Sequence, residues 1–230
     1  MYIYKKILKY VLLFFMMFPV SVGAEDILIG NDKISTPLPN GYCHLNNSNQ
    51  SDSRLIKYLE DANQNINQIN LVFADCEQLR LWRKGESATL NDYGYVLAPL
   101  GLVNKKLNMS RKEYLSQMEN IFRKQGIKFL NKSTSDIKKV IERHFPAVEL
   151  NETKSLGIIH QDNNALYFGI IQNIQTEEGK QKTMLGLFAI TLVSKKSVNF
   201  YLWKEYQGER TIYDLEDLLT SWIRKVHLNN

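Results

Sequence analysis

The chain has 230 residues, of which 44% are hydrophobic and 23% charged, and its 29 Lys and Arg residues outnumber the 24 Asp and Glu residues. This length suits one well-packed domain and is short for two. Three of the basic residues lie within the first 24 residues, so the net charge is +5 for the whole chain but +2 for the chain after that segment. This modest charge argues against nucleic-acid binding.

Residues 1–24 have the pattern of a cleavable export signal. Three lysines precede an apolar run over 11–20, and Val22, Gly23 and Ala24 supply the small residues typical of a cleavage site. The apolar run is about half of the roughly twenty residues that a membrane-spanning helix needs, which favours cleavage after Ala24 over retention as an anchor. We therefore predict a signal peptide over 1–24, a single mixed α/β domain over 25–230 without a transmembrane segment, and a periplasmic or secreted protein.

Cys43 and Cys76 are the two cysteines of the chain, and both follow the predicted cleavage site. An even pair in an oxidising compartment is most simply a disulfide, which would stabilise the fold by roughly 3.7 kcal/mol on the chain-entropy model. The alternative is a redox or nucleophilic thiol, but the chain has no C-x-x-C motif, and a nucleophilic thiol needs an identified neighbouring base to activate it. We predict a structural disulfide.

The segment 26–100 alternates short β-prone runs with two amphipathic segments. We expect short strands and turns over 26–45, a helix capped by Ser51 or Asp52, a strand over 69–74, a short helix over 77–84 that Gly85 stops, and a strand over 93–100. The first helix should cover an apolar surface, because its apolar residues form one stripe: Leu55, Leu59, Ala62 and Ile66.

The segment 105–143 combines two predicted helices with an excess of positive charge. Ser110 and Glu113 form a capping box that predicts a helix as far as Gly126, and a second helix is expected over 136–144. The segment contains eleven basic and four acidic residues and stands at +7, while the rest of the chain after residue 24 stands at −5. The pattern is typical either of solvated helices or of a patch that binds an acidic protein, lipid headgroups or polysaccharide. The residues of this predicted patch are Lys105, Lys106, Arg123, Lys124, Lys138 and Lys139.

The last eighty residues contain four strand-like runs separated by polar turns. The runs cover 155–161, 165–175, 182–193 and 197–206, which predicts a four-stranded antiparallel meander. Apolar residues occupy both alternating faces of the third run, so both faces of the sheet need cover. A final helix, which Thr211 can cap, carries an apolar stripe of Ile212, Leu215, Leu219, Trp222 and Val226. We therefore predict the α+β class, with a mostly antiparallel sheet and helices on both of its faces.

The chain lacks the motifs by which many enzymes are identified, including G-x-S-x-G, H-E-x-x-H, a Gly-rich phosphate loop and a metal-spaced cluster of Cys and His. We therefore expect no cofactor and no metal. One alternative is a polar site at His44 and Asp75, which a Cys43–Cys76 bridge would bring into one region for acid–base chemistry or metal binding. Because neighbouring residues of a strand point to opposite faces, these two side chains need not meet.

Aromatic residues are numerous near the end of the predicted meander and in the strand over 93–100. The group consists of Tyr93, Tyr95, Phe200, Tyr201, Trp203 and Tyr206. Such a group can stack on sugars or bind a partner, but strands favour aromatic residues for packing reasons alone. We predict that these residues belong to the core.

Two segments carry a resemblance to a known fold family: LPNGYCHL, with its P-x-G-Y pattern from Pro39 to Tyr42, and the strand-to-helix ending FYLWKEY followed by DLEDLLTSWI. With the order of predicted elements over most of the chain, they make it similar to PsbP-like proteins and to uncharacterised exported bacterial proteins. The resemblance implies an α/β/α sandwich and an extracytoplasmic accessory or assembly role without enzymatic chemistry. It transfers no functional residue.

These observations lead to two hypotheses about function. The first is an exported, periplasmic or secreted, non-enzymatic binding or accessory protein, whose partner is a protein or an anionic surface component and not nucleic acid. The alternative is an exported hydrolase-type enzyme with a dispersed active site, because scattered catalytic residues leave no motif. The ligand and the oligomeric state stay open.

Overall fold

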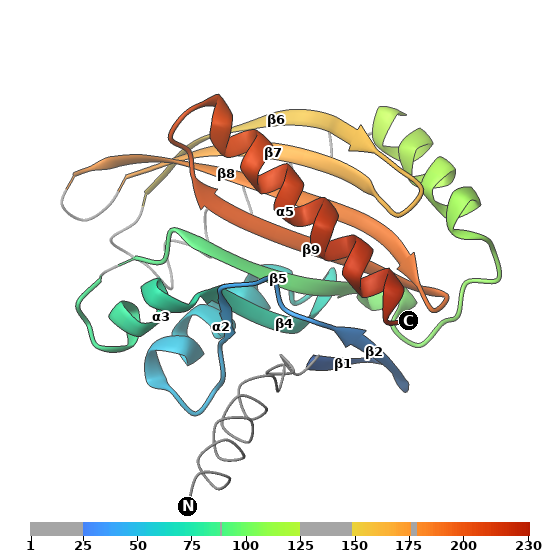
Figure 1. Ribbon diagram of the computed structural model, residues 1–230, viewed down its shortest axis with the longest axis horizontal. Helices are drawn as coiled ribbons and strands as arrows, with labels where there is room; N and C mark the ends of the chain where they lie inside the picture. Colours follow the sequence, from blue (N-terminus) through green and yellow to red (C-terminus); the bar gives the residue numbers. More distant parts are fainter. Residues whose placement is uncertain (1–24, 88, 125–148, 176–178) are drawn as a thin grey trace, which may run out of the picture.

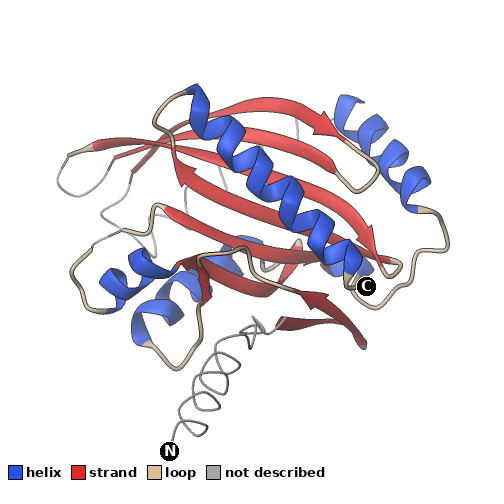
Figure 2. Ribbon diagram, in the orientation of Figure 1, coloured by secondary structure: helices blue, strands red, loops and turns tan. Residues whose placement is uncertain are grey.

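The computed structural model describes residues 25–87, 89–124, 149–175 and 179–230. They form a large antiparallel sheet, a two-stranded sheet and helices that pack against them (Figures 1 and 2). The strands of the large sheet lie in the order β3-β4-β5-β9-β8-β7-β6. The predicted α+β class, with a mostly antiparallel sheet and helices, is confirmed.

The elements follow one another along the chain in the order of their labels. The strands are β1 (Glu25–Ile29), β2 (Asp32–Thr36), β3 (Tyr42–His44), β4 (Asn67–Asp75), β5 (Asp92–Pro99), β6 (Glu149–Gln161), β7 (Leu166–Gln175), β8 (Gln181–Val193) and β9 (Lys196–Glu205). The helices are α2 (Gln50–Asn63), α3 (Cys76–Arg83), the short 3-10 helix η1 (Leu100–Leu102) and α5 (Glu209–Leu228), together with helical residues 111–124.

The predicted meander is present, because β6, β7, β8 and β9 pair consecutively and antiparallel. The last ten residues of β8 are all buried. Leu185 and Leu187 belong to one hydrophobic cluster, whereas Met184 and Phe188 belong to the other. Since successive side chains of a strand point to opposite faces, the sheet is buried on both faces, as its sequence predicts.

Helix α5 and the β1–β2 hairpin cover one face of the large sheet. Trp222 of α5 makes edge-to-face contacts with Phe73 and Phe200, with ring centroids 5.0 and 4.9 Å apart, and its Nε1 donates to the carbonyl oxygen of Pro37 at 2.6 Å. The hairpin adds Ile27, Ile29 and Ile34 to the same cluster.

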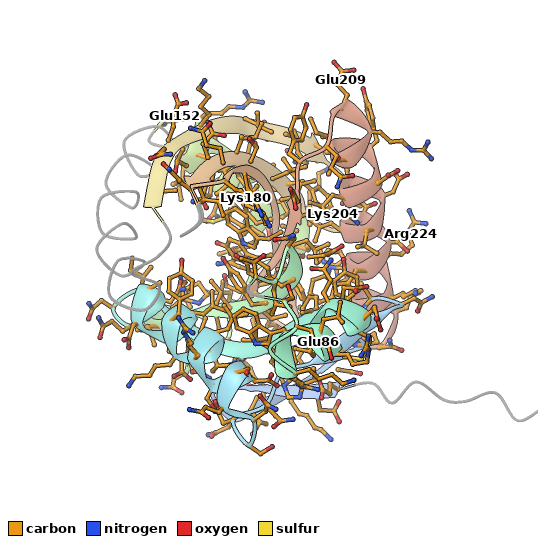
Figure 3. The ribbon with its side chains drawn as sticks, turned by 90° about the vertical axis from the view of Figure 1, so that its left-hand side faces the viewer. Glu86, Glu152, Lys180, Lys204, Glu209 and Arg224 are labelled. Carbon is orange, nitrogen blue, oxygen red and sulfur yellow. A yellow bond between two sulfur atoms is a disulfide. The ribbon has the colours of Figure 1, made fainter. Side chains whose placement is uncertain are left out.

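The other face is covered by α2, α3 and helix 111–124, which contribute Leu55, Leu79 and Leu115 to a second cluster. Figure 3 looks at the left-hand end of Figure 1 and shows α5 and α2 on different sides of the curved sheet. The predicted aromatic group lies largely in these clusters, as expected. Tyr95, Tyr201, Phe188 and Phe168 stack in one row across four strands, with successive ring centroids 4.7, 5.1 and 5.0 Å apart.

The helix starts differ from the sequence-based expectation in two places. The N-cap of α2 is Asn49, whose side chain accepts hydrogen bonds from the backbone of Ser51 and Asp52, so the predicted cap at Ser51 or Asp52 is wrong. Helix α5 begins at Glu209, after Gly208, and Thr211 is buried, where its Oγ1 accepts a hydrogen bond from Gln207 N. The predicted cap at Thr211 is therefore also wrong.

Two further local predictions can be compared with the structure. The capping box is confirmed, because Glu113 accepts hydrogen bonds from the backbone and hydroxyl of Ser110 and its own N–H donates back to that hydroxyl. Ile66 lies beyond the end of α2 and is exposed, so it does not continue the apolar stripe. The predicted helix over 136–144 and the predicted signal over 1–24 lie outside the described residues.

The predicted disulfide is present and joins Cys43 of β3 to Cys76, the first residue of α3. It spans 33 residues of sequence and holds the short edge strand β3 at the turn from β4 into α3. Within the ranges that the structure describes, no helix is both long and apolar enough to cross a membrane.

Replacing both Cys43 and Cys76 with serine should lower the free energy of unfolding by about 3–4 kcal/mol, because the unfolded chain regains the entropy of a loop of this length. Urea unfolding of the variant measures the loss. The wild-type protein in reductant serves as the control and should lose the same amount. If non-reducing digestion yields separate Cys43 and Cys76 peptides with free thiols, the bridge is absent from the protein in solution.

Candidate functional site

Four segments that are distant in sequence meet at one end of the large sheet, at the lower right of Figure 1 beside the C-terminus. They are the β1–β2 turn, the loop 103–110, the β8–β9 turn and the end of α5. Leu107 N donates to Lys195 O at 2.8 Å, which joins the loop to the β8–β9 turn. The side chain of Asn230 bonds to the backbone N and O of Ser35 at 3.0 and 2.8 Å, which joins α5 to β2. We call this region the basic end.

A buried lysine holds the basic end together. Lys196 is 2% exposed; its Nζ donates to Val103 O at 2.8 Å and lies 3.1 Å from Asp32 Oδ2. Asp32 Oδ1 also lies 2.6 Å from Lys106 Nζ. Hydrogen bonds from Lys106 and then Lys196 lower the pKa of the Asp32 carboxyl. One carboxylate therefore connects the hairpin, the loop and β9.

Gly30 allows the hairpin to approach this loop. It has a φ of +62°, and a Cβ atom at this position would lie 2.6 Å from Val103 O. Both the left-handed backbone and the close approach exclude a larger residue without a shift of the backbone. The turn of the hairpin is thus fixed against the loop that carries Lys105 and Lys106.

Exposed lysines gather around this framework. They are Lys33, Lys105, Lys106, Lys112, Lys195 and Lys225. Lys33 pairs with Asp26 and Lys106 with Asp32, both at 2.6 Å. No ion pair joins any of the other four to a residue that the structure describes, and the carboxylate of the neighbouring Glu113 is taken up by the capping box. The basic end therefore carries an excess of solvated positive charge.

The opposite end of the sheet is different. Figure 3 views it directly and shows the acidic residues Glu86, Glu152 and Glu209 among basic residues such as Lys204. Lys204 Nζ lies 2.9 Å from Asp92 Oδ2, so this charge is balanced locally. The opposite end therefore exposes charges of both signs, whereas the basic end exposes a cluster of lysines.

The structure separates the residues of the predicted patch. Lys105 and Lys106 lie at the basic end, but Arg123 and Lys124 lie at the last described turn of helix 111–124, roughly 20 Å further along its axis. Arg123 also pairs with Glu119 at 2.8 Å. Lys138 and Lys139 lie outside the described residues, so their part in the patch stays a prediction.

Four exposed lysines of the basic end lay outside the predicted patch: Lys112, which is close to Lys106 in the sequence, and three that tertiary contacts alone bring there. Lys33, Lys195 and Lys225 come from β2, the β8–β9 turn and α5. No spacing in the sequence relates these three positions. The one local signal was the turn between the last two strands, which places Lys195 in solvent.

His44 and Asp75 have separate structural partners. His44 Nδ1 lies 3.1 Å from Glu25 Oε1, whereas Asp75 caps α3 by accepting a hydrogen bond from Gln78 N at 3.0 Å. In the β3–β4 register Asp75 stands opposite Tyr42 and His44 opposite Phe73, so the two side chains share a face at diagonal positions. Their joint use in acid–base chemistry stays a prediction. In the portion of the chain that the structure covers, no group of three or more His, Cys, Asp and Glu side chains could hold a metal ion.

A half-buried histidine fastens the end of α5 at the rim of the basic end. His227 Nε2 lies 3.1 Å from Thr191 Oγ1 and 3.2 Å from Asn164 O, where it donates as the neutral Nε2–H tautomer. Burial, followed by the nearby charge of Arg111, lowers its pKa to about 4. The imidazole is therefore uncharged at neutral pH and serves as a fastening for the helix end.

Comparisons with known proteins give a fold resemblance and no family assignment. No family model and no curated protein matches the chain. Among solved structures, the chain is similar to the solution structure of cyanobacterial PsbP (CyanoP) from Synechocystis sp. PCC 6803, with 12% identity and a TM-score of 0.34 over 90% of this chain and 96% of that chain. The resemblance to PsbP-like proteins that the sequence indicated is thus confirmed as a weak likeness of fold, and no function follows from it.

Replacing Asp32 with asparagine should lower the urea midpoint of unfolding at pH 7, because it leaves the buried ammonium of Lys196 without a carboxylate. Lys106→Gln is the matched control and should cost less, since Lys106 is largely exposed. The folded-state pKa of Asp32 lies below its unfolded value of 3.8, so its contribution is present above that pH and is lost as the pH falls further. Equal losses in the two variants would contradict this role.

His227 should make the protein less stable as the pH falls from 6.5 towards 4. Its pKa is 6.5 in the unfolded chain and about 4 in the fold, so the unfolded state binds the proton first across this window. Urea midpoints measured between pH 7 and 4 should fall more steeply for wild-type protein than for His227→Gln. Parallel curves would show that the imidazole does not resist protonation.

Proposed function

We propose that the chain is an exported, non-enzymatic accessory protein that binds an anionic component of its surroundings through the basic end. The observation that carries the proposal is the cluster of exposed lysines without an ion pair among the described residues: Lys105, Lys112, Lys195 and Lys225. Ammonium groups so placed attract phosphate or carboxylate groups without first breaking an ion pair to a residue that the structure describes.

The hydrogen-bonded segments that carry these lysines favour a role in ligand binding over a surface that is only solvated. Lys105 and Lys195 stand on two segments joined by the hydrogen bond of Leu107, and that loop is fixed by the buried ammonium of Lys196. A rigid backbone keeps the charges together, so little conformational entropy is lost when a ligand engages them. The side chains keep their own flexibility and can adapt to a surface of variable structure.

Two features support export. The first 24 residues have the pattern of a signal peptide, and the disulfide between Cys43 and Cys76 is typical of proteins from oxidising compartments. The net charge of +2 after residue 24 is modest, so binding would depend on the local arrangement of charge rather than on the total.

A charge-reversal variant tests the proposal on protein recovered after export, with its N-terminus sequenced. Lys105, Lys112 and Lys195 are changed to glutamate, and binding is measured at low salt to heparin beads and to phosphatidylglycerol vesicles. The dissociation constant should rise at least about a hundredfold for the polyanion that wild-type protein binds, because each of the three lysines contributes about fivefold near an anionic surface.

The matched control reverses three exposed lysines elsewhere, Lys57 on α2, Lys84 beside α3 and Lys154 on β6, and so has the same net charge. It should bind nearly as tightly as wild-type protein. An equal loss in both variants would mean that total charge governs binding, and the absence of wild-type binding to either polyanion would refute the proposed function.

A further inference from the structure

The basic end also exposes large apolar side chains. Seven large hydrophobic residues are exposed within the described ranges, and four of them lie in or next to the segments that form the basic end: Leu28, Ile66, Leu100 and Leu228, at 61, 52, 44 and 80%. The remaining three, Ile121, Leu156 and Tyr213, are dispersed over helix 111–124, β6 and the start of α5. Scattered apolar residues are ordinary on a surface, but their concentration beside lysines that form no ion pair with a described residue is not.

Hydrogen bonds link the segments that carry these four residues to one another or to the basic end. Leu100 N donates to Ile66 O at 3.0 Å, which sets the start of η1 against the turn before β4. Leu28 O accepts a hydrogen bond from Asn70 Nδ2 at 2.6 Å, which ties β1 to the same stretch of β4. Leu228 lies two residues before Asn230, whose side chain is bonded to β2.

Lysines lie close to these apolar residues in the strand register or in the sequence. Leu28 stands directly opposite Lys33 in the β1–β2 register, so the two side chains share the outer face of the hairpin. Leu100 lies five residues before Lys105, and Leu228 three residues after Lys225. Apolar side chains beside lysines match the boundary between the headgroups and acyl chains of an anionic bilayer.

We infer that the basic end docks peripherally on an anionic phospholipid bilayer, with its lysines among the phosphates and Leu28, Leu100 and Leu228 inserted below them. The inference rests on the proposed function and names the partner. A hydrated polysaccharide offers phosphate or carboxylate groups to the lysines but no apolar medium for the leucines. A bilayer takes up both kinds of side chain, and burial of each CH₂ group adds about 0.8 kcal/mol, or fourfold in partitioning.

The deciding variant changes Leu28, Leu100 and Leu228 to serine and keeps every lysine. Its control changes Ile121 and Leu156, which are exposed elsewhere, to serine. Exported protein of each kind is sedimented with two types of vesicle, one of mixed phosphatidylglycerol and phosphatidylcholine and one of pure phosphatidylcholine. Each protein is also passed over heparin beads. Unchanged urea midpoints verify that the variants fold.

Wild-type protein should sediment with the anionic vesicles and not with pure phosphatidylcholine. The leucine variant should partition at least about tenfold more weakly, while its elution from heparin and the behaviour of the control stay unchanged. In addition, Leu228→Trp should shift its fluorescence to shorter wavelength on anionic vesicles and be quenched by brominated acyl chains.

Each contrary outcome has its own meaning. Retention on heparin without sedimentation would refute lipid docking and leave the proposed function intact, and failure to bind either would refute both. Equal sedimentation of wild type and the leucine variant, without a shift for Leu228→Trp, would refute insertion. If the wild-type protein does not bind vesicles but binds an acidic protein, and the leucine variant loses that partner, the surface is a protein interface and not a bilayer-docking site.

Discussion

The structure depends on one constraint: both faces of its central sheet are apolar and must be shielded from water. In β8, successive buried side chains enter two different clusters, so neither face can be left open. One face is closed by α5 and the β1–β2 hairpin and the other by α2, α3 and helix 111–124. Burial of a residue such as Trp222 or Phe168 contributes about 2–3 kcal/mol. With the faces occupied, the turns at the ends of the strands are the exposed polar parts.

A lysine at the basic end is either buried in an ion pair or exposed to solvent, and the backbone conformation decides which. Lys195 and Lys196 are adjacent, yet Lys195 is exposed whereas Lys196 is buried, with only 2% of its surface exposed. Ser194 and Lys195 have φ values of 47° and 66°, so they form a tight turn that projects Lys195 into solvent and starts β9 with Lys196 pointing inward. The inward lysine meets Asp32 and anchors the hairpin. The outward lysine then stands on a turn whose position that ion pair fixes.

The sequence predicts the fold better than the site because the two depend on interactions of different range. Alternating apolar residues, the capping box at Ser110 and the lone cysteine pair are local or nearly unique signals, and each led to the correct element. The prediction of helix caps failed where several neighbouring polar residues could serve as the N-cap, as at Asn49 and Ser51, because the path of the preceding loop determines which residue caps the helix. Charge counting grouped Lys105 with Arg123 although a helix separates them, and it could not find Lys195, because tertiary contacts determine which lysines meet.

The uneven charge has a consequence for orientation. The chain after residue 24 has a net charge of +2, so a lysine-rich end implies a net negative remainder. Beyond the Debye length of about 8 Å at physiological salt, an anionic surface acts on little more than the end nearest to it. At such short range that surface attracts the basic end more strongly than it attracts the acidic remainder, which favours one orientation. In the proposed docking, the opposite end of the sheet, with Glu86 and Glu209, would face away from the surface and stay accessible to other molecules.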